Sequence, residues 1–208
     1  ANYLSSLNEE HEHAKRSPYP QTLHLAFERV QEMRYGENPH QSAAFYRDIE
    51  APAGSLAHYK QLQGKGLSFN NIADADAAWE CVKSISDSEA ACVIIKHANP
   101  CGVAKNKSSL TSFKNAYACD PISAFGGVIA CNFKIDKKIA QEINKNFLEV
   151  ILAKSFDNNA LNILKKKKNL RIIDISKFKI KNLTTVKSFN NSFLVQSKDE
   201  LILDKKKL

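Results

Sequence analysis

The sequence lacks any hydrophobic run long enough to cross a membrane, and it shows no apolar leader. Its longest apolar stretch, Ala90–Ile95, covers only six residues, whereas a membrane-spanning helix needs about 18 to 20. The first 30 residues are instead rich in acidic side chains and histidine, which does not fit a secretion signal. We therefore expect a cytoplasmic protein with no membrane partner.

Glycine is scarce, and the cysteines do not occur in pairs. The five cysteines are an odd number and never form a C-x-x-C pair, so neither a disulfide framework nor a cysteine-based zinc site is expected. Three of them lie in apolar or strand-like surroundings, which is typical of reduced, buried thiols in cytosolic proteins. The seven glycines form no G-x-G-x-x-G or Walker pattern, so no standard nucleotide cofactor is predicted. With 43% apolar and 25% charged residues, the chain has the composition of a globular protein.

Positive charge is in excess, but it is unevenly distributed. Residues 1–132 hold 12 basic and 14 acidic side chains, whereas residues 133–208 hold 18 and 8. Such an asymmetry can indicate a nucleic-acid-binding region or a solvated, lysine-rich surface. Arg171 is the only arginine among residues 133–208, and core-like Phe and Ile residues are interleaved with the lysines of this part. We therefore favour a solvated surface and expect no nucleic-acid partner.

From residue 68 onwards, helical and strand-like patterns alternate. Apolar residues at helical spacing alternate with short, continuously apolar runs, which is typical of βαβ units. The sequence predicts an α/β fold with a mostly parallel sheet and helices on both faces. Ligands in such sheets bind beyond the carboxyl ends of the strands, so chemistry is expected just after Ile95, Cys131 and Ala153. The predicted helices cover 71–85, 109–118, a segment after Asp136 and 158–168, and the predicted strands cover 90–95, 128–131, 150–153 and 170–174.

The helix starts can be predicted in more detail. Asn71 is a plausible N-cap, with Asp74 three residues later in the first turn, where a carboxylate suits the helix dipole. Asp136 is expected to cap a helix that includes Phe147. Residues 1–32 show no clear strand pattern.

The most informative pair of residues is Lys96–His97, directly after the predicted strand that ends at Ile95. A histidine at this place can transfer protons near neutral pH, and the adjacent lysine can stabilise negative charge on an oxygen. Because successive strand residues point to opposite faces, both can reach one site only if the backbone leaves the pleat. The Pro/Gly-containing segment after His97 allows that.

The string from His97 to Cys101 also invites comparison with zinc deaminases. Their signature is H-x-E followed by P-C-x-x-C. Here Asn99 replaces the glutamate and Ala104 replaces the second cysteine. The zinc site cannot be assembled, and we expect no metal.

Two further strings concentrate groups that could bind a ligand. Residues 34–41, RYGENPHQ, hold a guanidinium, a phenol and amides around a turn, and arginine suits phosphate or carboxylate. Residues 120–127, DPISAFGG, end in two glycines before a predicted strand, where backbone could approach a ligand closely. Either string could also be no more than a hydrogen-bonded turn.

Taken together, five strings resemble one family. They are RYGENPHQ with AAFY, LSFNNIADADAAWECV, KHANPCGVA, DPISAFGGVIACN, and EVILA with ALNILKKKKNLR. They are similar to the bifunctional purine biosynthesis enzymes, within them to the AICAR transformylase (phosphoribosylaminoimidazolecarboxamide formyltransferase) domain. The resemblance runs in order from about Met33 to Val195. It implies that residues 1–32 are the tail of a preceding IMP cyclohydrolase domain and a linker, and that residues 33–208 are the first half of the transformylase domain.

The resemblance implies a function as well. It is formyl transfer from the cosubstrate 10-formyltetrahydrofolate to AICAR in IMP synthesis, by a homodimer with a cytidine-deaminase-like fold that has no zinc. His97 matches the proton acceptor and Lys96 its charge-stabilising neighbour. The matching substrate-binding positions are Arg34, Tyr35, Asn71, Gly126 and Glu149.

The sequence also departs from the family. Lys154 stands where the family usually has proline, which makes the loop expected there less certain. The transformylase domain of the family is about twice as long as the part found here, so we expect either a fragment or a truncated gene product. The alternative function is therefore a catalytically incomplete chain that folds and binds only nucleotide or a partner subunit.

Overall fold

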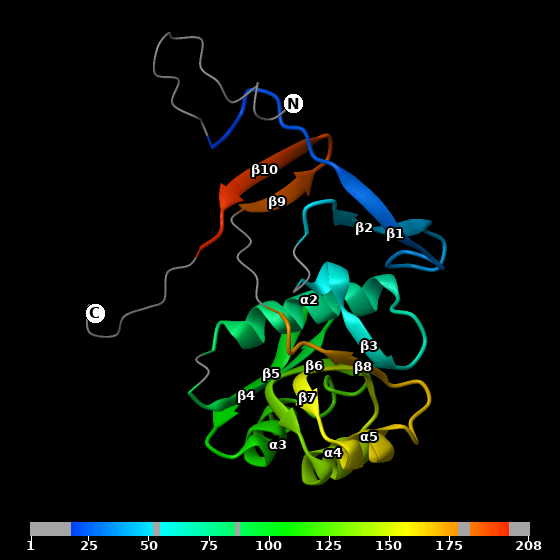
Figure 1. Ribbon diagram of the computed structural model, residues 1–208, viewed down its shortest axis with the longest axis vertical. Coiled ribbons are helices and arrows are strands. Elements are labelled where there is room, and N and C mark those ends of the chain that lie inside the picture. Colours follow the sequence, from blue (N-terminus) through cyan, green and yellow to red (C-terminus); the bar gives the residue numbers. More distant parts are fainter. Residues whose placement is uncertain (1–17, 52–54, 86–87, 179–183, 200–208) are drawn as a thin grey trace, which may run out of the picture.

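The structure is a computed structural model that describes residues 18–51, 55–85, 88–178 and 184–199. Its centre is a six-stranded sheet in the order β3-β8-β7-β6-β4-β5, and two separate hairpins pair β1 with β2 and β9 with β10. Figure 1 shows α2 on one face of the sheet with the hairpins beyond it, and α3, α4 and α5 together on the other face. The bounds are β1 Phe27–Met33, β2 Ala43–Asp48, the 3-10 turn η1 Leu56–His58, β3 Lys60–Gln63, α2 Phe69–Lys83, β4 Ala90–Lys96, β5 Asn99–Asn106, α3 Ser109–Cys119, β6 Gly127–Ile135, α4 Lys137–Asn144, β7 Leu148–Phe156, α5 Asn158–Leu164, β8 Arg171–Asp174, β9 Thr184–Phe189 and β10 Ser192–Ser197.

Four of the six strands of the central sheet run in the same direction. β6, β7 and β8 are parallel neighbours, and β5 shares their direction because β4 is antiparallel to both β5 and β6. The helices α3, α4 and α5 connect these four strands in sequence order, as expected for βαβ crossovers. The predicted α/β class, with a mostly parallel sheet covered on both faces, is confirmed.

The direction of β4 corrects the predicted position of the chemistry. β4 turns directly into β5 instead of into a crossover helix, so the Pro/Gly-containing segment after His97 is itself a strand. Ile95 pairs with Val128 at the start of β6. The carboxyl end of β4 therefore lies at the amino ends of β6 and β7, away from the ends near Cys131 and Ala153, so the three positions where chemistry is expected do not share one edge of the sheet.

The core lies in two layers, one on each face of the sheet. Along β4, Val93 and Ile95 pack with α2, whereas Cys92 and Ile94 pack with the helices of the opposite face. All four side chains are almost completely excluded from solvent. Two covered faces explain why this strand is continuously apolar and not alternating.

Several predicted helix ends differ in the structure: α2 ends at Lys83 and not at residue 85, and α5 ends at Leu164 and not at residue 168. The N-cap of α2 is Ser68, and Asn71 is its third residue, where the two side chains form a reciprocal capping box. Asp74 therefore belongs to the second turn and not to the first. Asp136 does cap α4, but α4 ends at Asn144, and Phe147 lies beyond it, 47% exposed.

The strands outside the βαβ pattern were not predicted. β1 crosses the expected boundary between residues 32 and 33, so residues 27–32 are a strand and not patternless linker. The hairpins belong to no covered sheet, and their exposed and half-buried residues follow no regular alternation. Lys154 lies inside β7, so there is no loop at that position. The part of the expected N-terminal tail at 1–17 lies outside the described residues.

Within the described ranges, no helix has the length and apolar character needed to cross a bilayer.

Candidate active site

Lys96 is the last residue of β4, and its ammonium group is held by backbone. Its Nζ donates to the carbonyl oxygens of Phe125 and Gly126, each at 3.1 Å. The side chain is half-buried. A positive charge is thereby fixed above the loop that enters β6, where it can stabilise an oxyanion.

This loop is shaped by Gly126, whose φ of +69° is rarely adopted by other residues. Its amide donates to the carbonyl of Phe147 at 2.8 Å. A Cβ at this position would lie 3.0 Å from Lys96 Nζ and 3.3 Å from the Phe147 ring. Glycine therefore allows both the turn and the close approach of the lysine.

The start of the same loop is fixed by Asp120. Its two carboxylate oxygens accept from the Ser123 amide at 3.0 Å and from the Ser123 hydroxyl at 2.5 Å. These hydrogen bonds favour the ionised form and lower the pKa of Asp120 below its ordinary value.

His97 lies at the tip of the β4–β5 hairpin, where Lys96 pairs with Asn99. The two turn residues, His97 and Ala98, have φ values of 52° and 57°, as a type I′ turn requires. At this turn the backbone leaves the pleat, which is the condition for Lys96 and His97 to reach one site. His97 is exposed. The Ala98 amide donates to Asp74 Oδ1 at 2.6 Å, and Asn99 Nδ2 donates to the His97 carbonyl at 2.9 Å.

Asn71 and Glu149 form a second group of candidate residues. Asn71 Nδ2 donates to Glu149 Oε2 at 2.8 Å. Asn71 is almost completely buried in the capping box of α2, and Glu149 is half-buried near the start of β7. The amide holds the carboxylate in one orientation, in which its remaining lone pairs can accept from substrate hydroxyl or amine groups.

Arg34 and Tyr35 follow β1 on the other side of α2. The Arg34 guanidinium is exposed and lies 5.8 Å from the centroid of the Tyr35 ring. Asn70 Nδ2 donates to the Glu37 carbonyl at 3.3 Å, which ties this loop to the N-terminus of α2. Among the described residues, no hydrogen bond or ion pair joins Arg34 or Tyr35 directly to the other candidates.

The structure therefore joins Lys96 to Gly126 and Asn71 to Glu149 around the first two turns of α2 and the loop before β6, whereas Arg34 and Tyr35 stay outside these contacts. Asp74 lies three residues after Asn71, on the same side of the helix, and reaches the turn beside His97.

Sequence reasoning missed two features of this site. Asp74 was interpreted as a helix-dipole carboxylate, although its contact is with the hairpin turn. Phe125 and Phe147 flank Gly126 with ring centroids 5.0 Å apart, and they are 62% and 47% exposed. The phenylalanine in the loop string was a visible signal for the first of them.

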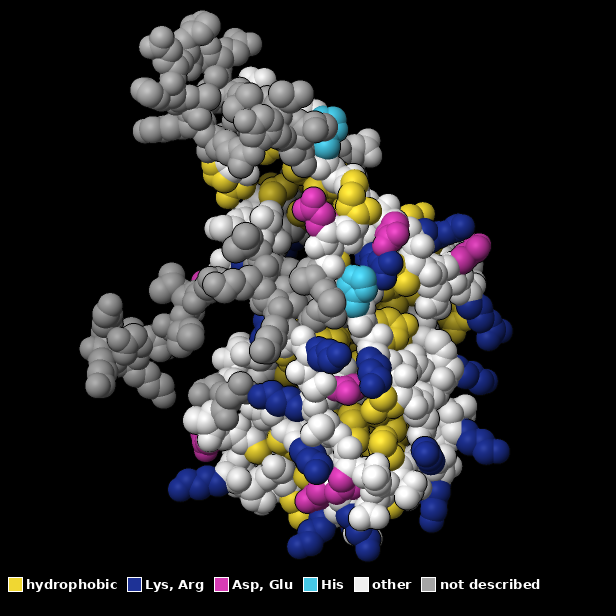
Figure 2. Space-filling model, viewed as in Figure 1, with side chains coloured by type: hydrophobic (Ala, Val, Ile, Leu, Met, Phe, Trp, Pro, Cys, Tyr) yellow, Lys and Arg dark blue, Asp and Glu magenta, His cyan; other side chains and the backbone are white. Residues whose placement is uncertain are grey.

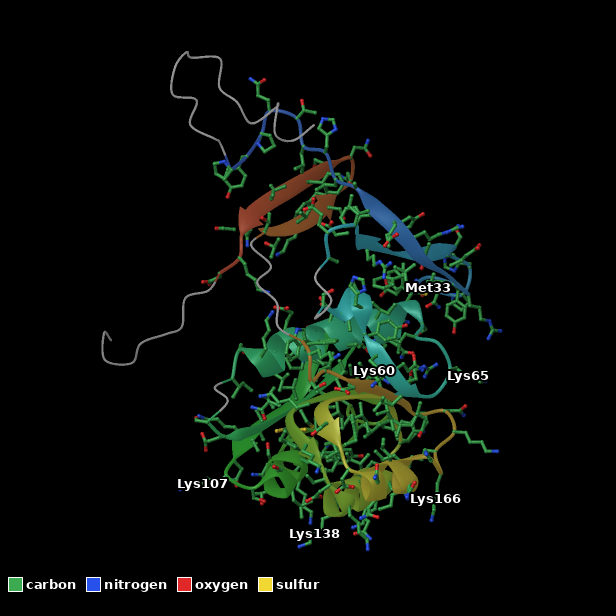
Figure 3. All side chains as sticks on the ribbon, viewed as in Figure 1. Met33, Lys60, Lys65, Lys107, Lys138 and Lys166 are labelled. Atoms are coloured by element: carbon green, nitrogen blue, oxygen red, sulfur yellow. The ribbon has the colours of Figure 1, made fainter. Side chains whose placement is uncertain are left out.

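On the face that Figure 2 shows, the basic side chains do not gather in one place. Figure 2 shows Lys and Arg side chains spread around the sheet domain on the visible face. In Figure 3, Lys107, Lys138 and Lys166 lie at its outer margin. This distribution resembles a solvated surface more than a binding stripe. In the described part of the chain, no cluster of three His, Cys, Asp or Glu side chains could hold a metal ion.

Comparison with known proteins decides the family. All 208 residues match the family model described as the AICARFT/IMPCHase bienzyme. The chain belongs to this family. The family resemblance inferred from the five strings is confirmed.

Two relatives are named bifunctional purine biosynthesis protein PurH. The relative from Polynucleobacter asymbioticus is 58% identical over 202 residues, which are 96% of this chain and 38% of the relative. The relative from Polynucleobacter necessarius subsp. necessarius is 56% identical over the same shares. The chain therefore spans less than two fifths of the length of these relatives.

A solved structure, a putative formate dehydrogenase accessory protein from Desulfotalea psychrophila, is 10% identical. It matches with a TM-score of 0.39 over 63% of this chain and 57% of its own. A likeness of this degree supports no inference.

Proposed function

We propose that this chain supplies the nucleotide-binding and proton-transfer groups of an AICAR transformylase that acts in purine biosynthesis. Family membership and 58% identity to a protein named for that pathway support the proposal. The observation that carries it is the antiparallel pairing of β4 with β6, with Lys96 Nζ bonded to the Gly126 carbonyl and His97 next to Lys96 in the β4–β5 turn.

The proposed reaction is formyl transfer from 10-formyltetrahydrofolate to AICAR. The AICAR amine is a poor nucleophile because its electrons are drawn into the imidazole-carboxamide. As a bond forms between this nitrogen and the formyl carbon, His97 accepts the amine proton, and the bond from the formyl carbon to the folate nitrogen breaks, with a proton returned to that nitrogen. Lys96 stabilises the negative charge that develops on the formyl oxygen.

The other candidates bind the nucleotide in this proposal. Arg34 provides an exposed cation for its phosphate, with Tyr35 packed against the guanidinium. The Asn71–Glu149 pair and the backbone at Gly126 bind its polar groups. The cosubstrate is a folate, no metal takes part, and no nucleic acid or membrane is a partner.

The domain assignment and the assembly belong to the proposal too. We place the start of the transformylase part before β1, with cyclohydrolase tail and linker in front of it. The active form is a homodimer. The two hairpins expose several large apolar side chains, which a partner subunit could cover. They include Phe27, Val30, Tyr46, Phe189, Phe193 and Leu194.

A chimaera tests the function, in which this chain replaces the matching segment of the P. asymbioticus relative. With His97→Ala we expect kcat for formyl transfer to fall about 10²- to 10⁴-fold, as for loss of a general base. The KM for AICAR should change only a few-fold. His58→Ala, at an exposed histidine that contacts Arg47, should retain activity. A His97→Ala chimaera within a few-fold of the parent would overturn the assignment.

A further inference from the structure

The His97–Ala98 turn has an unusual composition for its backbone geometry. Both residues have positive φ, and type I′ turns normally use Asn or Gly there because other side chains clash with the backbone. Neither residue here is Asn or Gly. A contact from outside the hairpin would therefore help to hold the turn in this conformation.

The structure provides this contact through the peptide group between His97 and Ala98. The N–H of this peptide donates to Asp74 Oδ1 at 2.6 Å, and its carbonyl accepts from Asn99 Nδ2 at 2.9 Å. The bond from Asn99 is local to the hairpin. The bond to Asp74 spans 24 residues, so it is the one that fixes the turn relative to the rest of the site.

Asp74 is itself well fixed. It is 9% exposed and lies in α2, which packs against β4, β6 and β7. The same helix carries Asn71, which holds Glu149. One rigid element thus sets the positions of both the histidine turn and the carboxylate of β7.

We propose that Asp74 is a positioning residue for His97. This inference rests on the proposed function: the Asp74 carboxylate holds the strained turn so that the imidazole faces the bound amine. Asp74 touches neither substrate nor reacting atoms. Displacing a catalytic group by about 1 Å can cost on the order of 100-fold in rate, so the anchor should affect kcat much more than nucleotide binding.

The kinetic test uses the chimaera. Asp74→Ala and Asp74→Leu remove the acceptor, and we expect kcat to fall about 10- to 100-fold while the KM for AICAR stays within a few-fold. Asp74→Asn keeps an acceptor oxygen and should retain most of kcat. Asp76→Ala, an exposed aspartate on the same helix, is the matched control and should match the parent.

A second-site change separates positioning from general loss of structure. Glycine at position 98 adopts positive φ without a clash. Adding Ala98→Gly to Asp74→Ala should therefore raise kcat about tenfold over Asp74→Ala, and Ala98→Gly alone is the reference. Hydrogen exchange of the Ala98 amide in the 208-residue chain gives a readout that is independent of activity. Exchange should be slow in the parent and in Asp74→Asn, and fast in Asp74→Ala.

The outcomes distinguish the two proposals. If His97→Ala loses activity while Asp74→Ala stays within about twofold of the parent, the positioning role is wrong and the proposed function stands. The positioning role is also wrong if Asp74→Asn is as slow as Asp74→Ala, or if Ala98→Gly restores nothing. If His97→Ala itself keeps its activity, the proposed function is wrong, and slow exchange of the Ala98 amide then establishes only a structural anchor.

Discussion

At the scale of single residues, Gly126 meets two demands that no other residue type meets together. Its φ is +69°, and the space beside its Cα is occupied by Lys96 Nζ and the Phe147 ring. The first demand concerns backbone sterics and the second concerns packing. Both are local, so their effect on stability can be measured directly.

We expect Gly126→Ala to lower the free energy of unfolding by about 1–2 kcal/mol, because an L-residue is strained at this φ and its Cβ would press on Lys96. Urea unfolding of the 208-residue chain measures this. Gly66→Ala is the matched control: its Cβ would meet only Gln31 Nε2, at 3.7 Å. That change should leave stability the same or raise it by up to about 1 kcal/mol. Equal effects of the two substitutions would contradict the argument.

Asp120 gives a prediction about pH. Hydrogen bonds from Ser123 lower the pKa of Asp120, so Ser123→Ala should raise it towards the ordinary value of about 3.9. Since a lowered folded-state pKa stabilises the fold above the unfolded pKa, this contribution is present at neutral pH and is lost as the pH falls through the folded pKa. NMR titration of the Asp120 carboxyl measures the shift.

The control for this titration is Ser108→Ala. Its hydroxyl accepts from the Thr111 amide at the start of α3 and has no bond to Asp120. The pKa of Asp120 should stay where it is in the parent. If Ser123→Ala also leaves that pKa in place, the hydroxyl hydrogen bond is not the cause of the lowered pKa.

At the scale of elements, β5 and α3 are in close backbone contact at the edge of the sheet. A Cβ at Gly102 would lie 2.0 Å from the carbonyl oxygen of Ala116. The atoms that this Cβ would meet all belong to the backbone of Ala116, which cannot turn aside as a flexible side chain can. The helix can therefore cover this part of β5 only because residue 102 has no side chain.

Gly102→Ala should thus force α3 away from the sheet. We expect the free energy of unfolding to fall by about 3 kcal/mol or more, at the upper end of overpacking effects. Urea unfolding beside the Gly66→Ala control checks this. A loss below about 1 kcal/mol would show that the helix moves away at little cost and that the close packing is not a constraint.

At the scale of the whole molecule, the chain covers 38% of the P. asymbioticus relative. The candidates Arg34, Tyr35, Asn71, Gly126 and Glu149 are all assigned to the nucleotide in the proposal, and none to the folate. Formyl transfer requires the donor to be held within about 3–3.5 Å of the amine in an aligned pose. We therefore expect the alternative, a chain that binds nucleotide without catalysis, for the 208-residue polypeptide by itself.

We expect this polypeptide alone to show no measurable formyl transfer. Calorimetric titration should detect weakened binding of AICAR, because Arg34 and the Gly126 loop are present, and no binding of a folate analogue. The unmodified chimaera, assayed in parallel, shows that the assay works. Robust turnover by the 208-residue polypeptide would place the donor site within this chain.

The sequence by itself determined the elements that obey a simple period. The run Ala90–Ile95 is apolar throughout because both faces of β4 are covered, and the apolar spacing of α2 follows from its packing on one face. The candidate residues Lys96, His97 and Gly126 could also be predicted from the sequence, because the residue type alone indicates the chemical or conformational property of each. The exposed two-stranded hairpins could not be predicted, because no buried face imposes an alternating pattern on their residues.

Only the tertiary structure decided which ends of the strands meet. Periodicity is the same for a strand of either direction, so the sequence could not tell that β4 runs antiparallel to β6. That direction brings the end of β4 to the amino ends of β6 and β7, where Lys96 contacts Gly126. The sequence also could not show the hydrogen-bond partner of Asp74. That bond spans 24 residues and depends on how α2 lies on the sheet, which spacing along the chain does not reveal.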